Sequence, residues 1–458
     1  MDNKTKKLKL SFYGGARTVT GSNFLLENDN AKILIDCGLF QGCETCDEKN
    51  RKPFRYDPAE VDVLFVTHSH IDHIGRIPKL VKEGFNGVIY STLPSHDIAK
   101  IMLQDSLKVF GIGTGERKLP PLYAKRDVEK TMNLWRTLQY GEEIVIKDDF
   151  KVTLRNSGHV LGSSIVEIVY NGKKIAFTGD MGGGSSPILR DVEAITDADY
   201  LVMESVYGDR KHEGVTERKD KLEDVIEDTV NKKGVLMIPA FSLERTQQLL
   251  FDLNDLVENS KIPIVSIFLD SPLAIKITDI YRKYSSYFND EAQRIIKSGD
   301  DVFKFTNLHP TLSAQESIKI NSSINPKIII AGSGMSTGGR IVYHEKRYLS
   351  DPMSTLLIVG YQAAGTTGRE IQEGAKEVTV SGEKVKVNAR IETISSYSAH
   401  MDSEDLLDFA SRSSDTLKKI FVVMGEPSSS LYLVQKIKDN IDVDAVSPEE
   451  GQSVELDF

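Results

Sequence analysis

Between residues 63 and 78 the chain reads Val63-Leu64-Phe65-Val66-Thr67-His68-Ser69-His70-Ile71-Asp72-His73-Ile74-Gly75-Arg76-Ile77-Pro78. The apolar run at the start predicts a buried strand. The glycine and proline near the end predict that a helix begins just after His73. A turn at the end of a rigid strand can direct several side chains toward one point, so we expect a functional site here.

Three imidazoles and one carboxylate lie within the six positions from His68 to His73. Imidazole nitrogen and carboxylate oxygen are preferred ligands of zinc and similar divalent metals. The chain has only nine histidines, so a chance polar turn is a poor explanation for three of them in six positions. Four such side chains exceed the need of one zinc if other ligands come from elsewhere in the chain, which predicts two metal ions.

Other polar residues follow further predicted strands. Asp36 follows the strand 32–35, His159 comes after the strand that ends at Leu154, Asp180 follows 174–177, and Glu204 follows 200–203. Taken alone, His159 suits a structural role and Asp36 an ordinary turn. A carboxylate can share its two oxygens between two cations, so Asp180 suits a position between metals.

The His-x-His-x-Asp-His pattern, followed in order by His159 and Asp180, resembles the metallo-β-lactamase superfamily. The resemblance implies two Zn²⁺ ions and the ligand set His68, His70, Asp72, His73, His159 and Asp180. In that family the first two histidines bind one metal, the next Asp-His pair binds the second, and the late aspartate bridges them. Asp36 then orients the site by contacting a ligand rather than a metal.

The chain after Gly208 changes to alternating strands and helices. We expect strands at 234–239, 264–269, 327–331 and 355–360, with helices between them. This alternation implies a parallel sheet with helices on both faces, and loops at the carboxyl ends of such strands form binding crevices.

Several of these loops carry groups that suit a substrate phosphate. Hydroxyls, guanidinium groups and backbone N–H groups at helix starts all bind phosphate oxygens. The candidates are Ser242, Arg245, Ser333 and Arg340. One Gly-rich loop alone would be weak evidence, but several after successive strands are stronger. His344, one turn beyond Arg340, either joins this group or is an ordinary surface histidine.

Ser398-Ala399-His400 resembles the middle motif of the β-CASP branch, which is named for a domain inserted into the metallo-β-lactamase fold. The resemblance implies that His400 works with Glu204 as general acid. The implied fold class is α/β, a metallo-β-lactamase αββα sandwich with an inserted β-CASP α/β domain. We expect the sandwich to comprise residues 1–208 and 391–458, and the inserted domain residues 209–390.

Met424 departs from the pattern of the branch, which usually has a histidine just before Gly-Glu as the last ligand of the second metal. A thioether is a poor substitute for imidazole on zinc. We therefore expect the second metal to be held less tightly. RNA-acting members usually carry histidine there and DNA-repair members an aliphatic residue, so this position leaves the substrate open.

The remaining sequence is similar to short bacterial and archaeal RNA-processing members, relatives of ribonuclease J and of the mRNA 3′-end cleavage subunit. The resemblance implies zinc-dependent hydrolysis of phosphodiester bonds in single-stranded RNA, as endonucleolytic RNA processing, with cleavage from the 5′ end as the alternative that the sequence leaves open. The catalytic residues would be Asp72, Asp180, Glu204 and His400. The alternatives are a DNA nuclease of the same branch and a weakly catalytic RNA-binding subunit. The sequence is also compatible with a homodimer.

Length and composition set outer bounds. A chain of 458 residues with 27% charged residues is typical of a soluble protein of about two to four domains. The net charge of −10 argues against non-specific coating of nucleic acid, which usually needs a basic surface. The Lys-rich start lacks the apolar core of a signal peptide, and no run reaches the length of a membrane span, so we expect a cytoplasmic protein and no membrane partner.

The three cysteines, Cys37, Cys43 and Cys46, lie close together in the sequence. Cys43 and Cys46 form a CxxC pair, which could be half of a metal site, but the chain has no second pair to complete it. We expect the three thiols to be reduced and incidental to the function.

Overall fold

The computed structural model describes residues 7–43, 45–111, 120–184, 186–212 and 217–458. The chain packs as two compact units. Unit 1 comprises Met1–Gly184, Asp191–Lys211 and His400–Phe458, and unit 2 comprises Ser185–Arg190 and His212–Ala399. None of the helices in the described ranges has the length and apolar content that a membrane span requires.

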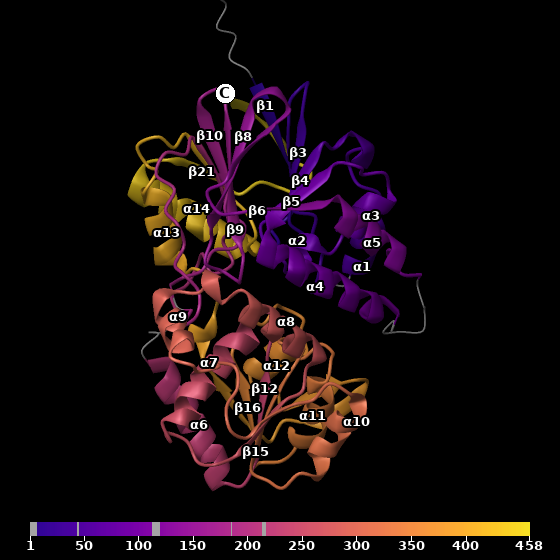
Figure 1. Cartoon of the computed structure of the whole chain (residues 1–458), viewed down its shortest axis with the longest axis vertical. Helices are drawn as coiled ribbons and strands as arrows, with labels where there is room; N and C mark the ends of the chain where they lie inside the picture. Colours follow the sequence, from indigo (N-terminus) through magenta and orange to yellow (C-terminus); the bar gives the residue numbers. More distant parts are fainter. Residues whose placement is uncertain (1–6, 44, 112–119, 185, 213–216) are drawn as a thin grey trace, which may run out of the picture. The chain divides into compact units, whose positions relative to one another are not determined.

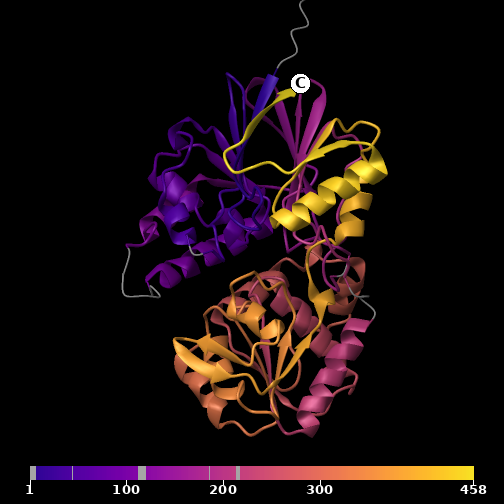
Figure 2. The same cartoon turned by 180° about the vertical axis from the view of Figure 1, so that it is seen from behind.

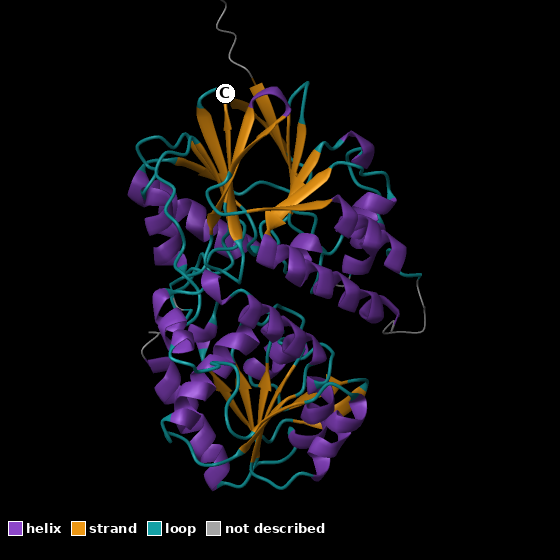
Figure 3. Cartoon of the chain, in the orientation of Figure 1, coloured by secondary structure: helices purple, strands orange, loops and turns teal. Residues whose placement is uncertain are grey.

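Unit 1 contains two seven-stranded sheets (Figures 1 and 3). The first has the order β22-β1-β2-β3-β4-β5-β6, parallel from β3 to β6 and antiparallel from β22 to β3. Its strands are β1 (Lys7–Gly14), β2 (Asn23–Glu27), β3 (Lys32–Ile35), β4 (Val63–Phe65), β5 (Val88–Thr92), β6 (Trp135–Leu138) and β22 (Ser453–Asp457).

The second sheet has the order β21-β20-β11-β10-β9-β8-β7. It is antiparallel from β7 to β10 and parallel from β10 to β21. Its strands are β7 (Glu143–Ile146), β8 (Phe150–Asn156), β9 (Ser164–Tyr170), β10 (Lys173–Phe177), β11 (Tyr200–Met203), β20 (Lys419–Val422) and β21 (Asp444–Val446). Figure 2 shows the yellow C-terminal segment returning to unit 1, where β20 and β21 join this sheet and β22 joins the other.

The inner faces of the two sheets share one apolar core, in which Phe12 and Phe65 of the first sheet meet Val166 and Phe421 of the second. Helices cover both outer faces. The first sheet packs against α3 (Ile77–Lys82), α4 (Leu93–Gly111) and α5 (Lys125–Leu134), and the second against α13 (Ser403–Ser411) and α14 (Pro427–Ile441). This helix-sheet-sheet-helix layering confirms the predicted αββα sandwich.

Unit 2 is built on a parallel six-stranded sheet of order β14-β13-β15-β12-β16-β19, beside the small hairpin β17–β18. The strands are β12 (Val235–Pro239), β13 (Ser266–Leu269), β14 (Leu308–Pro310), β15 (Lys327–Ala331), β16 (Thr355–Ile358), β17 (Glu377–Val380), β18 (Glu383–Lys386) and β19 (Arg390–Thr393). The helices are α6 (Glu217–Asn231), α7 (Arg245–Glu258), α8 (Pro272–Lys283), α9 (Asp290–Lys297), α10 (Ala314–Lys319), α11 (Ile341–Tyr348) and α12 (Thr367–Gln372). The alternation confirms the expected α/β architecture.

Two elements differ from the prediction. The sequence from Lys125 to Leu138 predicts one helix, but the helix ends at Leu134, because 135–138 form β6, which pairs with β5. Trp135 Nε1 donates to Ser91 Oγ at 2.9 Å, so a long-range contact fixes the strand. The helix expected just after His73 is confirmed as α3 (Ile77–Lys82), which has Pro78 in its first turn, but the sequence did not predict the one-turn helix α2 (Ile71–Ile74) that contains Asp72 and His73.

The predicted boundary at 390/391 falls inside β19, whereas unit 2 continues to Ala399. The reason is that β19 pairs in parallel with β16 of the unit 2 sheet. Whether the two units are domains that fold independently stays a prediction.

The expectation of three reduced thiols is wrong for Cys43 and Cys46, which form a disulfide. The pair lies at the start of α1 (Cys46–Arg51), where the Cα atoms are 5.1 Å apart and within reach of a bond. Cys37 is a buried free thiol, and burial raises its pKa to about 12.

Candidate metal centre

Four ligand-type side chains of unit 1 converge on one point. They are His68, His70, His159 and Asp180, whose donor atoms all lie within 4.8 Å of one another. His70 Nδ1 lies 3.0 Å from His68 Nε2 and 3.2 Å from His159 Nε2. Two nitrogen ligands of one tetrahedral zinc, each about 2.0 Å from it, lie roughly 3.3 Å apart. The cluster therefore has the spacing of a single metal site.

A second set of ligand-type atoms lies on the other side of Asp180. Its Oδ2 is 3.5 Å from both His68 Nε2 and His159 Nε2, whereas its Oδ1 is 3.5 Å from His73 Nε2. Asp72 Oδ2 lies 4.0 Å from the same His73 nitrogen. Asp180 Oδ1 and His73 Nε2 are buried polar atoms without a hydrogen-bond partner. Such atoms are rare in proteins, and a bound cation would satisfy both, so these residues fit a metal ion.

Asp36 fixes the turn 67–73 through hydrogen bonds to its side chains and backbone. It is fully buried, and its Oδ2 accepts hydrogen bonds from His73 Nδ1 at 2.7 Å and from the hydroxyls of Thr67 and Ser22. Its Oδ1 accepts the backbone N–H of Thr67 at 2.8 Å. Because Nδ1 of His73 is engaged, Nε2 is left to face the site, which is the usual role of a carboxylate behind a metal-binding histidine.

Close backbone approaches bring the loops together. Gly179 has a φ of +54°, and a Cβ there would lie 2.6 Å from the Cβ of Thr67. Gly182 would likewise place a Cβ 2.1 Å from the carbonyl oxygen of Gly158. Only glycine permits these contacts, so the loop after β10 can press Asp180 against the loops that carry His68 and His159.

His400 and Glu204 form a second group beside Asp180. The three offer ligand-type atoms that lie within 4.8 Å of one another. His400 Nδ1 is 3.0 Å from Oε2 of the fully buried Glu204, whose Oε1 accepts the N–H of Met181 at 2.5 Å. The rings of His400 and His159 lie 4.5 Å apart, which places His400 at the edge of the histidine cluster.

Burial and neighbouring charges shift the pKa values of the side chains in the centre. Burial lowers the pKa of His68 well below its usual range and raises the pKa of Asp72 to about 6. Burial opposes the charge on His73 too, but the Asp180 and Asp36 carboxylates raise its pKa well above the ordinary value. Burial would also raise the pKa of Asp180, yet His73 and His68 hold it far below its usual range. Asp180 is thus an anion that needs adjacent positive charge, which a metal cation can supply.

Met424 follows β20 and is 2% exposed. Its side chain belongs to the apolar core between the sheets, and its sulfur lies 2.5 Å from where a Cβ on Gly15 would be. The residue therefore packs as a core side chain.

The four candidate phosphate contacts lie in loops of unit 2 or at the starts of the helices that follow them. Gly332, next to Ser333, would place a Cβ 3.7 Å from Ser242 Oγ, and a Cβ on Gly360 would lie 3.8 Å from Arg245 Nε. The loops after β12, β15 and β16 therefore meet at one edge of the sheet. Arg245 is the first residue of α7, and its Nη1 donates to Gln248 Oε1 at 2.9 Å.

Arg340 forms an ion pair inside unit 2 with Asp270, a residue that the sequence analysis did not single out. Its Nη1 lies 2.7 Å from Asp270 Oδ1 and also donates to the carbonyl of Thr311. His344 is buried, so it is not an ordinary surface histidine, and its Nε2 lies 2.8 Å from Asp270 Oδ2, the same carboxylate that pairs with Arg340. Asp270 directly follows β13, and that position was the signal that could have suggested its role.

Comparisons with known proteins agree with this architecture. The profile of the metallo-β-lactamase superfamily matches residues 16–230, that of the Beta-Casp domain matches 246–371, and that of the Zn-dependent metallo-hydrolase RNA specificity domain matches 384–448. The fold and the matched profiles define a metal-dependent hydrolase.

Individual relatives extend over most of the chain. Ribonuclease TTHA0252 of Thermus thermophilus is 34% identical over 92% of this chain and 94% of its own length. An RNase J-like protein of Methanocaldococcus jannaschii is 31% identical, covering 96% and 98%, and the transcription termination factor FttA of Pyrococcus horikoshii is 31% identical, covering 99% and 72%. The chain belongs to the metallo-β-lactamase superfamily, in its β-CASP branch, as the sequence pattern indicated.

A solved structure supports the same fold. A protein of unknown function from Enterococcus faecalis V583 aligns with a TM-score of 0.57 at 12% identity, covering 98% of this chain and all of that one. At this identity the likeness concerns the fold alone.

Proposed function

We propose that the protein is a zinc-dependent ribonuclease that hydrolyses phosphodiester bonds within single-stranded RNA. The observation that carries the proposal is the cluster of His68, His70, His159 and Asp180, with the Glu204–His400 pair beside it. Similarity to proteins named ribonuclease and the match to an RNA specificity profile support RNA as the substrate. An RNA substrate also favours a cytoplasmic location.

The proposed ligands divide into two groups. His68, His70 and His159 would hold a first zinc, Asp72 and His73 a second, and Asp180 both. The separate distances from the two Asp180 oxygens to His68 and His73 support a bridging role. Bound zinc would supply Lewis-acid charge at the scissile phosphate and activate water.

The protein's own residues then position and move protons. Asp36 fixes His73 through Nδ1, so the imidazole presents Nε2 to the site. Glu204 accepts the Nδ1 proton of His400, and protonated His400 can donate its Nε2 proton to the leaving sugar oxygen. Burial raises the pKa of Glu204 while the neighbouring His400 opposes that shift, so the two groups would exchange charge as a pair.

Arg245, Ser242 and Ser333 are the proposed contacts to substrate phosphate. Their loops meet at the carboxyl edge of the unit 2 sheet, where N–H groups and guanidinium groups suit phosphate oxygens. Arg340 was proposed with them, but its ion pair with Asp270 gives it a structural role as well.

Matched, end-labelled single-stranded RNA and DNA test the proposal. We expect the wild type to cut RNA at internal positions, and Asp72→Ala to lose roughly a hundredfold or more of this activity. Asp29→Ala, in an exposed turn of unit 1, is the control and should cut like the wild type. Preferential cutting of DNA would favour the DNA nuclease, and RNA binding without cutting would favour the non-catalytic subunit. Products released only from the 5′ end would contradict the endonucleolytic mode.

A further inference from the structure

Unit 1 contains a cavity of about 350 Å³ that the proposed reaction does not use. Four cationic side chains line it, Lys49, Lys52, Arg55 and Arg76, together with one acidic side chain, Glu450. Glu450 lies 3.0 Å from Lys49 and 3.6 Å from Arg55, and Glu48, which does not line the cavity, lies 3.0 Å from Lys52, so two carboxylates offset part of the four positive charges. In a protein with a net charge of −10, such a basic cavity indicates an anionic ligand.

Arg76 is the most deeply buried cation of the cavity wall. The residue is 5% exposed, and its Nε donates to the carbonyl of Gly38 at 2.5 Å, whereas its Nη2 is buried without a hydrogen-bond partner. Nη2 itself is out of reach of solvent, so a phosphate would meet the charge of this guanidinium through the other atoms of Arg76 that line the cavity. The guanidinium lies 4.7 Å and 5.4 Å from the ring centroids of Phe40 and Phe54, which hold it in place.

Aromatic rings form the apolar part of the cavity wall. Phe54, Tyr56 and Tyr13 follow one another with ring centroids 5.4 Å and 5.1 Å apart, and all three line the cavity. Phe54 and Tyr56 are partly exposed. Cations interleaved with accessible rings are the usual means of binding a nucleotide, because the phosphate meets the cations while the base stacks.

The cavity is connected to the metal centre through one loop. The N–H of Cys37 donates to the carbonyl of His73, and the N–H of Arg76 donates to the carbonyl of Cys37, both at 2.8 Å. Leu39 N–H donates to Ile71, and Gly38 packs so tightly on Asp72 that a Cβ would lie 1.4 Å from its carbonyl oxygen. The loop 37–39, to which Arg76 is hydrogen-bonded, therefore also contacts the turn 67–73 that carries proposed metal ligands.

We propose that this cavity binds a nucleoside phosphate, with the phosphate on Arg76 and the lysines and the base against the aromatic wall. The ligand is a nucleotide of the RNA strand that lies outside the scissile bond, and in this respect the proposal rests on the proposed function. A free mononucleotide would bind through the same contacts. The experiment distinguishes it from the RNA strand by measuring the two as separate probes.

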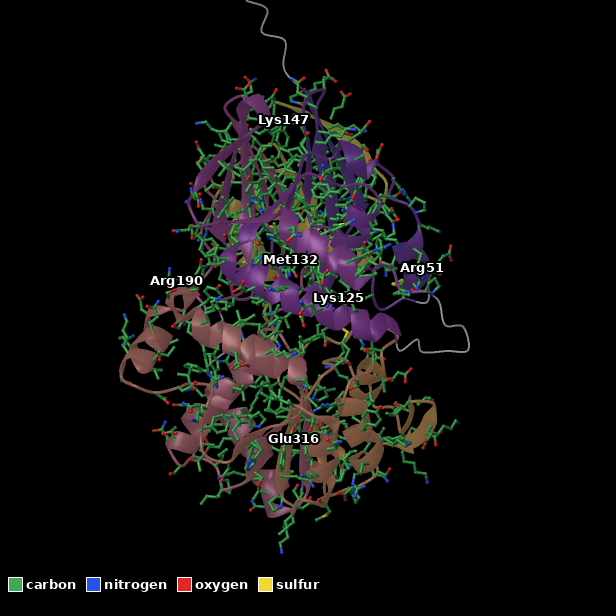
Figure 4. All side chains as sticks on the ribbon, turned by 45° about the vertical axis from the view of Figure 1, so that its right-hand side comes forward. Arg51, Lys125, Met132, Lys147, Arg190 and Glu316 are labelled. Atoms are coloured by element: carbon green, nitrogen blue, oxygen red, sulfur yellow. A yellow bond between two sulfur atoms is a disulfide. The ribbon has the colours of Figure 1, made fainter. Side chains whose placement is uncertain are left out.

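Binding is measured with the full-length, zinc-loaded protein carrying His400→Ala, which keeps RNA intact. The cavity variant is Lys52→Glu with Arg55→Glu, two side chains that are 63% and 58% exposed and so tolerate replacement. The control is Lys125→Glu with Arg126→Glu at the start of α5, both 79% exposed, which changes the net charge by the same amount (Figure 4 labels Lys125). The probes are adenosine 5′-monophosphate and a 20-nucleotide single-stranded RNA.

We expect the cavity variant to raise the Kd for the RNA about tenfold and to reduce the salt dependence of binding by roughly 1.4 in log-log slope, as for two lost phosphate contacts. The control should change Kd by less than about threefold, because charges remote from the bound strand act only through screened attraction. Arg76→Lys, which keeps the cation but loses the planar guanidinium, should weaken adenosine monophosphate binding while metal content stays unchanged, and its melting temperature should fall because the Nε hydrogen bond to Gly38 and the contacts with Phe40 and Phe54 are lost.

Each outcome supports or overturns the proposed nucleotide site. Loss of RNA affinity in the cavity variant supports the strand as ligand, and loss of mononucleotide binding alone supports the free nucleotide and overturns the strand. Equal binding of both probes in the cavity and control variants overturns the cavity as a nucleotide site. If the wild type cut no RNA but the cavity variant lost mononucleotide binding, the proposed function would fail and the cavity site would stand.

Discussion

At the scale of single residues, Met424 is the position where this chain departs from its family. The thioether lies in the apolar core, so the second group of proposed ligands, Asp72, His73 and Asp180, lacks the imidazole that the branch usually adds. We expect the wild type to bind its second zinc more weakly than its first. Met424→His should tighten the second site, because imidazole is a much better zinc ligand than a thioether. Zinc titration monitored by competition with a chelator measures both affinities.

Met424→Leu is the matched control, since it keeps an apolar side chain of similar volume. It should leave both zinc affinities unchanged. A second zinc that binds Met424→His no better than Met424→Leu would show that the histidine position is not a ligand position in this chain.

Arg245 is the residue on which the proposed phosphate contact most depends. Replacing it with alanine should lower the turnover of single-stranded RNA by roughly tenfold to a hundredfold, the value of a hydrogen bond to a charged group. Zinc content should not change, because the ligands lie in unit 1 and Arg245 in unit 2. Arg340→Ala is the contrasting variant, since it leaves the buried Asp270 with one ion pair fewer and should reduce stability. Wild-type turnover in Arg245→Ala would exclude Arg245 as a phosphate contact.

Glu345 makes stability depend on pH. Burial raises its pKa from 4.5 to about 7, and Ser336 Oγ donates to its Oε1. Because the folded-state pKa lies above the unfolded one, the stabilising contribution is complete below the unfolded pKa and is lost as pH rises through about 7. Between pH 5.5 and 8.5 the loss is about 2 kcal/mol. Glu345→Gln has no carboxyl group to titrate, so its free energy of unfolding should fall less over this range.

Chemical unfolding of the zinc-loaded proteins at the two pH values provides the measurement. The comparison of variant with wild type cancels the contribution of the metal centre. Equal pH dependence of the two proteins would mean that Glu345 does not titrate near neutrality.

At the scale of elements, periodicity and strand-end residues predicted most of the architecture. Apolar runs gave β3, β11 and β15 with the observed bounds, and the polar residues after β4 and β10 converge as expected. The errors arose where long-range pairing decided the structure. Residues 135–138 continue a helical pattern but join β5, and the four residues of α2 were too few for a periodic signal.

Contacts that depend on distant residues could not be predicted from local sequence. The Asp270 network joins β13 to α11, and its members are far apart in the chain. The packing of Met424 into the core depends on Gly15 and on a strand from the other sheet. Such contacts follow from the assembled fold, and no local pattern marks them.

The loop after β10 is the element whose shape matters most for the metal centre. Gly179→Ala should reduce zinc affinity and stability, because the new Cβ would lie 2.6 Å from Thr67 and push Asp180 away from the histidines. Gly172→Ala is an almost ideal control. Its φ is +78°, so it carries similar backbone strain of about 1 kcal/mol, but nothing lies within 4 Å of its Cβ. Zinc content after dialysis and the melting temperature distinguish the two variants, and equal effects would remove the loop contact as the explanation.

At the scale of the whole molecule, charge limits how RNA can be held. A protein with a net charge of −10 does not attract a polyanion overall, so binding must come from a few placed groups such as Arg245 and the cations around Arg76. Each neutralised phosphate of a single strand contributes about −0.7 to the slope of log K against log salt. With three or four such contacts, we expect a slope of roughly −2 to −3.

The slope is measured with cleavage-deficient His400→Ala protein and single-stranded RNA at several salt concentrations. A shallow slope is the expected result, because the acidic remainder of the surface repels the strand and only local contacts release counterions. A slope steeper than about −5 would require seven or more neutralised phosphates, more than the placed cations named here can supply. In that case RNA would be held by an extended basic surface, and the roles of Arg245 and of the cavity around Arg76 would both be minor.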